Sequence, residues 1–149
     1  MLDVTAPEHI MTMPQAPYVE RFDFGSLATL AGYDVPQQAR PGGNLPILLV
    51  WQARSETSED YKAFVHLLDA NDRMVAGSDA IPGDWQRPTT GWIAGEFISD
   101  PHTVKLPPDL PPGKYRLEVG LYDTSLRRLA TEEGLSAVIL SQPIEVSNP

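Results

Sequence analysis

The sequence of 149 residues has no cysteine and no long apolar run. Without cysteine the chain forms no disulfide, no thiolate nucleophile and no cysteine-type zinc site. No stretch approaches the ~18 apolar residues of a membrane span, so we expect no direct membrane insertion. The first 17 residues, "MLDVTAPEHIMTMPQAP", carry neither a basic region nor an apolar core. We therefore predict that they are not a signal peptide, and we expect any export signal or anchor to lie outside this chain.

Basic residues are scarce as well, since 11 Lys and Arg stand against 20 Asp and Glu and give a net charge of -9. Nucleic-acid binding needs a basic surface, and anionic membranes attract basic segments, so the charge argues against both partners. The acidic residues are scattered, which predicts a soluble surface that repels its own copies. An apolar fraction of 42% is ordinary for a globular protein and allows a real core at this length.

The chain does contain short strand-like runs separated by Pro and Gly turns. In "KYRLEVGLYD" apolar residues alternate with polar or small ones, which is the period of a half-buried antiparallel strand. The nearly continuous apolar run "LPILLVWQA" predicts a central strand covered on both faces. The run "EFISDPHTVKL" predicts a strand that is broken or bulged at Pro101. The runs "YKAFVHLLD" and "RMVAGSDA" predict a hairpin that turns at residues 70–72.

About eight such runs follow one another, and no segment keeps a helical period for three turns. We therefore predict an all-β protein, a two-sheet antiparallel β-sandwich of immunoglobulin-like or jelly-roll type, with less than about 10% helix. Residues 1–17 are predicted to be a linker or an extended lead-in. Residues 18–149 are predicted to form a single β-sandwich domain.

No residues in the chain form a recognisable catalytic motif. GxSxG, HxH and HExxH spacings are all missing from the sequence, and we predict no catalytic residues, no metal and no cofactor. His66 is interpreted as a histidine satisfied inside or at the rim of the sandwich, with a general base or metal ligand as the alternative. Five carboxylates cluster in sequence and are assigned to turns or the solvated surface, with a calcium site or a catalytic pair as alternatives: Asp69, Asp79, Asp84, Glu96 and Asp100.

Two of the three tryptophans lie in one connection, "GDWQRPTTGWIAGE". Trp51, within the most apolar strand, is predicted to belong to the core. Trp92 lies near a strand entry, where a large aromatic usually folds over the end of a sandwich, so we predict that it closes the core. Trp85 lies among polar residues that suit stacking on a sugar ring. The predicted ligand-binding residues are Trp85, Asp84, Arg87 and Asp79.

Four stretches together resemble a known kind of module: "LLVWQARSETSEDYKAFVHLLD", "PTTGWIAGE", "LPPDLPPGKYRLEVGLYD" and "RRLA". They are similar to an accessory β-sandwich module of bacterial envelope proteins, often C-terminal to protein-mannosyltransferase-like membrane glycosyltransferases. The resemblance covers roughly residues 18–146 and carries no catalytic residue. It implies an extracytoplasmic, non-catalytic role near glycan or lipid-linked sugar chemistry.

These observations predict a non-enzymatic accessory or interaction module of a bacterial cell-envelope protein. A carbohydrate-binding module is the alternative, and a small hydrolase built on scattered carboxylates and His66 is a third. The expected partners are a glycan or a larger membrane protein. The sequence does not indicate an oligomeric state or the identity of a ligand.

Overall fold

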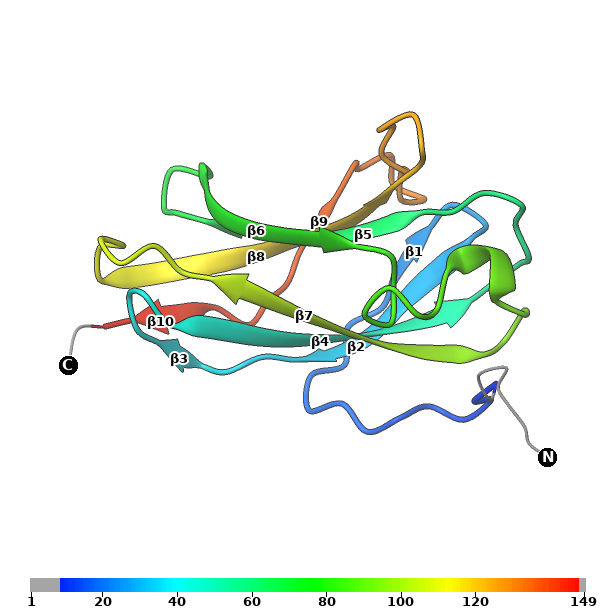
Figure 1. The fold of residues 1–149 in the computed structure, drawn as a ribbon, viewed down its shortest axis with the longest axis horizontal. Helices are drawn as coiled ribbons and strands as arrows, with labels where there is room; N and C mark the ends of the chain where they lie inside the picture. Colours follow the sequence, from blue (N-terminus) through cyan, green and yellow to red (C-terminus); the bar gives the residue numbers. More distant parts are fainter. Residues whose placement is uncertain (1–8, 148–149) are drawn as a thin grey trace.

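The computed structural model describes residues 9–147 and shows two β-sheets packed face to face (Figure 1). One sheet has the strand order β1-β2-β4-β7. The other has the order β3-β10-β8-β5-β6, with β9 paired to β8. The strands are β1 (Phe22–Phe24), β2 (Ala28–Asp34), β3 (Gln38–Ala39), β4 (Asn44–Ala53), β5 (Lys62–Leu68), β6 (Met74–Ala80), β7 (Phe97–Lys105), β8 (Gly113–Tyr122), β9 (Val138–Ile139) and β10 (Ile144–Val146).

This architecture confirms the predicted all-β sandwich. Residues 9–147 contain ten strands where about eight are predicted, because β1, β3, β9 and β10 are only two or three residues long. Among the described residues the one helical element is the 3₁₀ turn η1 (Thr89–Gly91). No helix in residues 9–147 is long and apolar enough to cross a membrane. The part of the predicted lead-in that falls on residues 1–8, and the domain end at 148–149, lie outside the described residues.

The centre of the first sheet is β4, whose alternate residues Leu45, Ile47, Leu49 and Trp51 enter the core. The prediction that β4 is covered on both faces is correct only in part, because Pro46 is exposed. Coverage of the outer face increases along the strand, since Leu48 is half-buried and Val50 is fully buried. Lead-in residues Met13 and Ala16 pack against Gly32, the cross-strand partner of Val50, and cover the sheet at that point.

Strand β7 forms the edge of the first sheet and, within residues 9–147, pairs with the lead-in only at Phe97, and the prediction of a break at Pro101 is wrong. Its register with β4 runs without a shift from Phe97 to Lys105, with Pro101 opposite Leu48. An edge strand tolerates proline because only one of its sides must supply ladder hydrogen bonds. Figure 1 shows β7 passing below β6, the edge strand of the other sheet.

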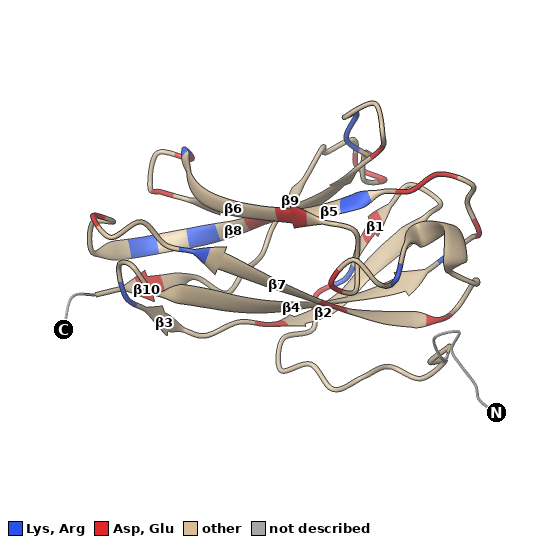
Figure 2. Ribbon diagram, viewed as in Figure 1, with Lys and Arg blue, Asp and Glu red and all other residues tan. Residues whose placement is uncertain are grey.

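The predicted hairpin is confirmed as β5 and β6, which pair from Ala63↔Ala80 to Leu68↔Met74. Its turn is held by Asp69, whose Oδ1 accepts hydrogen bonds from the Asn71 and Arg73 amides at 2.8 and 3.0 Å. Figure 2 shows that the acidic residues are spread over the loops and both sheets rather than gathered on one face.

Candidate ligand-binding site between β6 and β7

The loop between β6 and β7, residues 81–96, carries the chain from the edge of one sheet to the edge of the other. Its second half is anchored in the core. Trp92 is 1% exposed, and its Nε1 donates a hydrogen bond to the Arg87 carbonyl at 2.9 Å. Thr89 is fully buried, donates to the Glu59 carbonyl and accepts from the Tyr61 amide. The prediction that Trp92 closes the core is confirmed.

Glu96 ties the end of the loop to earlier residues of the same loop and to the lead-in. This fully buried carboxylate accepts hydrogen bonds from the Ile93 amide and from Arg87 Nη2, both at 2.8 Å, and pairs with His9 at 2.8 Å. Burial raises the pKa of Glu96, but the hydrogen bonds from His9, Ile93 and Arg87 outweigh it, and the pKa lies below its ordinary value. Arg87 is therefore engaged in holding the loop.

Trp85 lies in the first half of the same loop and is 56% exposed. Gly83, Asp84 and Trp85 have φ angles of 71°, 57° and 71°, a left-handed run that costs non-glycine residues free energy. A turn holds this run, since the Trp85 amide donates to the Ile81 carbonyl and the Arg87 amide donates to the Pro82 carbonyl, both at 2.9 Å. Strained backbone of this kind clusters at functional sites.

Beside Trp85 lies a hollow of about 310 Å³, which we call the flank pocket. Strand β6 supplies Asp79 to its lining, the loop supplies Asp84 and Trp85, and β7 supplies Thr103. Asp79 and Asp84 are exposed carboxylates, and Lys62 places its Nζ 5.1 Å from the centroid of the Trp85 ring. The remaining lining residues are Ser78, Ala80, Pro101 and His102.

A buried polar network forms the floor of the flank pocket. The Asp100 carboxylate accepts hydrogen bonds from Trp51 Nε1 and from the Gly83 amide, each at 2.9 Å. His102 Nε2 lies 2.9 Å from the same carboxylate, and its Nδ1 lies 3.2 Å from Ser78 Oγ. The network therefore joins β4, β6 and β7 to the start of the Trp85 turn.

The order serine, histidine and carboxylate is that of a nucleophilic triad. A triad histidine must pass a proton to the leaving group, which requires contact with the substrate. Here the His102 side chain is 1% exposed, and Asp100 is already bonded to Trp51 and Gly83. This enclosure favours a structural role in which the network holds the two sheet edges and the loop together.

A second hollow, of about 240 Å³, lies on the outer face of the β5–β6–β8 sheet and is called the face pocket. Phe64 and His66 of β5 and Tyr122 of β8 line it, together with Asp79. Tyr122 donates a hydrogen bond to Asp79 at 2.5 Å; burial, followed by this bond, raises the pKa of Tyr122 to about 12. Leu126 and Arg128, from the loop after β8, complete the lining.

Of the four predicted ligand-binding residues, the structure brings Trp85, Asp84 and Asp79 together at the flank pocket. Arg87 lies apart from this lining, in its ion pair with Glu96. The expectation that His66 lies inside or at the rim of the sandwich is wrong, because it lies half-buried on the outer face of β5, 3.1 Å from Glu118. The assignment of Glu96 and Asp100 to turns or the solvated surface is wrong, because both carboxylates are fully buried. The sequence analysis missed the network that Asp100 forms with His102 and Ser78. The alternation of inward and outward residues in β7 could have indicated this network, because Asp100 and His102 occupy inward positions.

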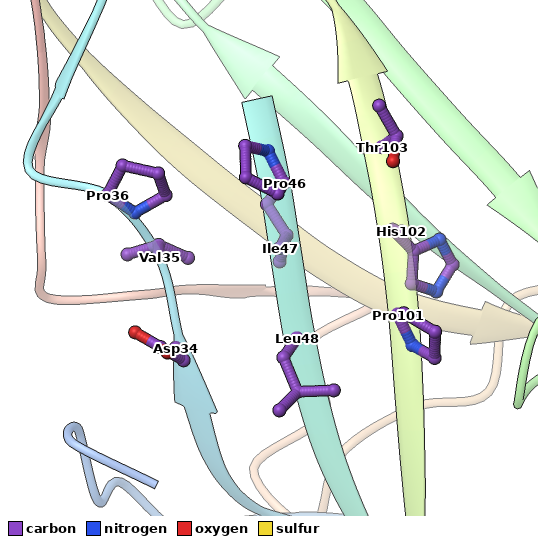
Figure 3. A pocket seen from close by; sticks show the side chains of 9 residues that line it. All are labelled: Asp34, Val35, Pro36, Pro46, Ile47, Leu48, Pro101, His102 and Thr103. Carbon is purple, nitrogen blue, oxygen red and sulfur yellow. The ribbon is translucent and has the colours of Figure 1, made fainter. Parts of the chain in front are cut away.

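A further hollow, of about 360 Å³, lies on the outer face of the first sheet (Figure 3). Prolines and aliphatic side chains form most of its wall, with Asp34 as its one acidic residue. Proline offers no N–H donor, so this hollow has few groups that could orient a polar ligand. Among residues 9–147 no cluster of three His, Cys, Asp or Glu side chains could hold a metal ion.

No family model matches the chain, and no curated protein matches its sequence. Its fold is similar to the crystal structure of the C-terminal domain of wzt, with a TM-score of 0.59 and 14% identity over 89% of this chain and 80% of that one. A CARDB domain from Pyrococcus furiosus has a TM-score of 0.47 and 7% identity over 92% and 96%. A Niemann-Pick type C2 protein from the Japanese carpenter ant has 0.47 and 8% over 91% and 100%. The likeness to the wzt domain concerns the fold alone and agrees with the β-sandwich class.

Proposed function

We propose that the chain is a non-catalytic accessory module of an extracytoplasmic envelope protein and that it binds carbohydrate at the flank pocket. The single observation that carries the carbohydrate part is Trp85, a large aromatic ring left 56% exposed by a strained turn beside two exposed carboxylates. The envelope setting is supported by the resemblance of the strand and turn motifs described above.

The chemistry of the pocket suits a sugar. The apolar C–H face of a pyranose stacks on an exposed indole ring, while its hydroxyls donate to carboxylates. Trp85 supplies the ring, and Asp79 and Asp84 supply the acceptors. Because the network of Asp100, His102 and Ser78 fixes the start of the turn, the ring is held in place before a ligand arrives, which lowers the entropy cost of binding.

A glycan array with the full chain, followed by fluorescence titration of each hit, tests the proposal. Trp51 and Trp92 are 0% and 1% exposed, so a change in tryptophan emission on adding a glycan reports mainly on Trp85. We expect Trp85→Ala to abolish binding and Trp85→Phe to retain part of it. Leu135→Ala removes another exposed apolar side chain outside the pocket and is the matched control.

Two results would contradict the proposal. The first is an array on which no glycan binds the wild-type chain. The second is binding that Trp85→Ala leaves unchanged, which would place the site elsewhere.

A further inference from the structure

The flank pocket and the face pocket share one residue, Asp79. Its strand, β6, is the edge of the sheet, so a ligand in one pocket can reach the other by crossing a single strand. Lys62 lies over the Trp85 ring and is the cross-strand partner of Tyr122, which lines the face pocket. The two hollows are therefore neighbouring parts of one surface.

The register of the sheet places the residues of the face pocket in two neighbouring rows. One row across the strands holds Asp79, Phe64 and Gly120, and the next row holds Gly77, His66 and Glu118. Two of these six positions are glycine and carry no side chain. A Cβ at Gly120 would lie 2.3 Å from the Phe64 ring, so only glycine lets this ring lie flat across β8.

The face pocket adds the N–H donors of Arg128 to the carboxylate acceptors Asp79 and Asp84 of the flank pocket. Arg128 places its guanidinium 4.5 Å from the centroid of the Phe64 ring, and this group carries N–H donors. His66 adds the two nitrogens of its imidazole ring, and its Nδ1 lies 3.1 Å from a carboxylate oxygen of Glu118. Carboxylates and basic groups are balanced here, which suits an uncharged ligand rich in hydroxyls.

We propose that the site takes an extended neutral oligosaccharide, with one sugar on Trp85 in the flank pocket and following sugars crossing Asp79 into the face pocket. This inference rests on the proposed function and adds the ligand class and its length. Tyr122 occupies one oxygen of Asp79. The other oxygen can accept a hydroxyl where the chain crosses β6.

Fluorescence titration with three neutral series tests this inference: α-1,4-glucans, β-1,4-glucans and β-1,4-mannans, each from the monosaccharide to the hexasaccharide. In the series that binds, we expect affinity to rise about tenfold or more from disaccharide to hexasaccharide. A rise of that size is what contacts in the second pocket would add. Arg128→Ala is expected to reduce that gain. Arg127→Ala removes the same charge from the neighbouring exposed residue, which does not line the pocket, and is the control.

Other results would overturn the inference in distinguishable ways. Trp85-dependent binding with equal affinity for disaccharide and hexasaccharide would refute the extended site and leave the proposed function standing. Binding of none of the three series, together with an empty glycan array, would refute both. Dimerisation in sedimentation experiments that Arg128→Ala abolishes, without glycan binding, would make this face an interface between copies of the chain.

Discussion

Trp85 and Trp92 lie in the same loop but in opposite environments. Trp92 is 1% exposed, and buried polar residues on both sides of it bond to other segments, Thr89 to Glu59 and Glu96 to His9. Trp85 is 56% exposed, and its neighbour Asp84 lines an open pocket. In this loop the buried ring lies between two polar residues that anchor the loop, whereas the exposed ring lies beside a carboxylate that lines an open pocket.

The largest expected effect removes the buried member of the pair. Trp92→Ala leaves a cavity at the end of the core and should lower the free energy of unfolding by about 3–5 kcal/mol. Urea unfolding of the variant and of the wild type measures this loss. A loss below about 1 kcal/mol would mean that Trp92 does not close the core, and the comparison would fail.

A smaller loss is expected when the floor of the flank pocket is altered. Asp100→Asn replaces one acceptor oxygen by a donor that faces the N–H groups of Trp51, His102 or Gly83, and should cost about 3 kcal/mol. Because Gly83 is released, amide hydrogen exchange should accelerate in residues 83–86 more than in residues 89–96. Ser78→Ala, which removes only the outermost bond, is the control. Equal acceleration in both halves would show that the network does not serve the Trp85 turn selectively.

Glu96→Gln tests the anchor of the buried half and should cost about 1.5 kcal/mol at neutral pH. The folded-state pKa of Glu96 is depressed, so its contribution is present above the ordinary value of about 4.3 and is lost as pH falls through the folded pKa. Urea melts over that acidic range should therefore show a shallower pH dependence for Glu96→Gln than for the wild type. Glu133→Gln, an exposed glutamate, should keep the wild-type slope.

The smallest effect concerns the exposed ring. Trp85→Ala should change stability by only about 0.5 kcal/mol, as surface substitutions do. Trp85→Gly should be more stable than Trp85→Ala, because φ at this position is 71° and glycine adopts that conformation without steric cost. The same urea assay decides both points. A Trp85→Ala loss as large as that of Trp92→Ala would place both rings in the core and remove the main support for carbohydrate binding.

The sequence predicted the sandwich and the environments of all three tryptophans because these depend on local patterns. Alternation in β8 and the Pro and Gly turns identify strands without knowledge of their partners. The network of Ser78, Asp100 and His102 depends on which edges meet, and that is set by the pairing of distant strands. Arg87 and Asp84 are both polar neighbours of Trp85 in sequence. Only the path of the loop decides that Arg87 bonds to Glu96 while Asp84 lines the pocket.

Pro101 has a consequence for self-association. A free strand edge is a template on which another molecule can add a strand, and such pairing leads to aggregation. Proline carries no N–H, so a strand added along β7 would miss a hydrogen bond at the middle of the edge. The other sheet ends at β6, where Asp79 adds a charge beside the pocket. Both edges that border the flank pocket thus resist intermolecular β-pairing.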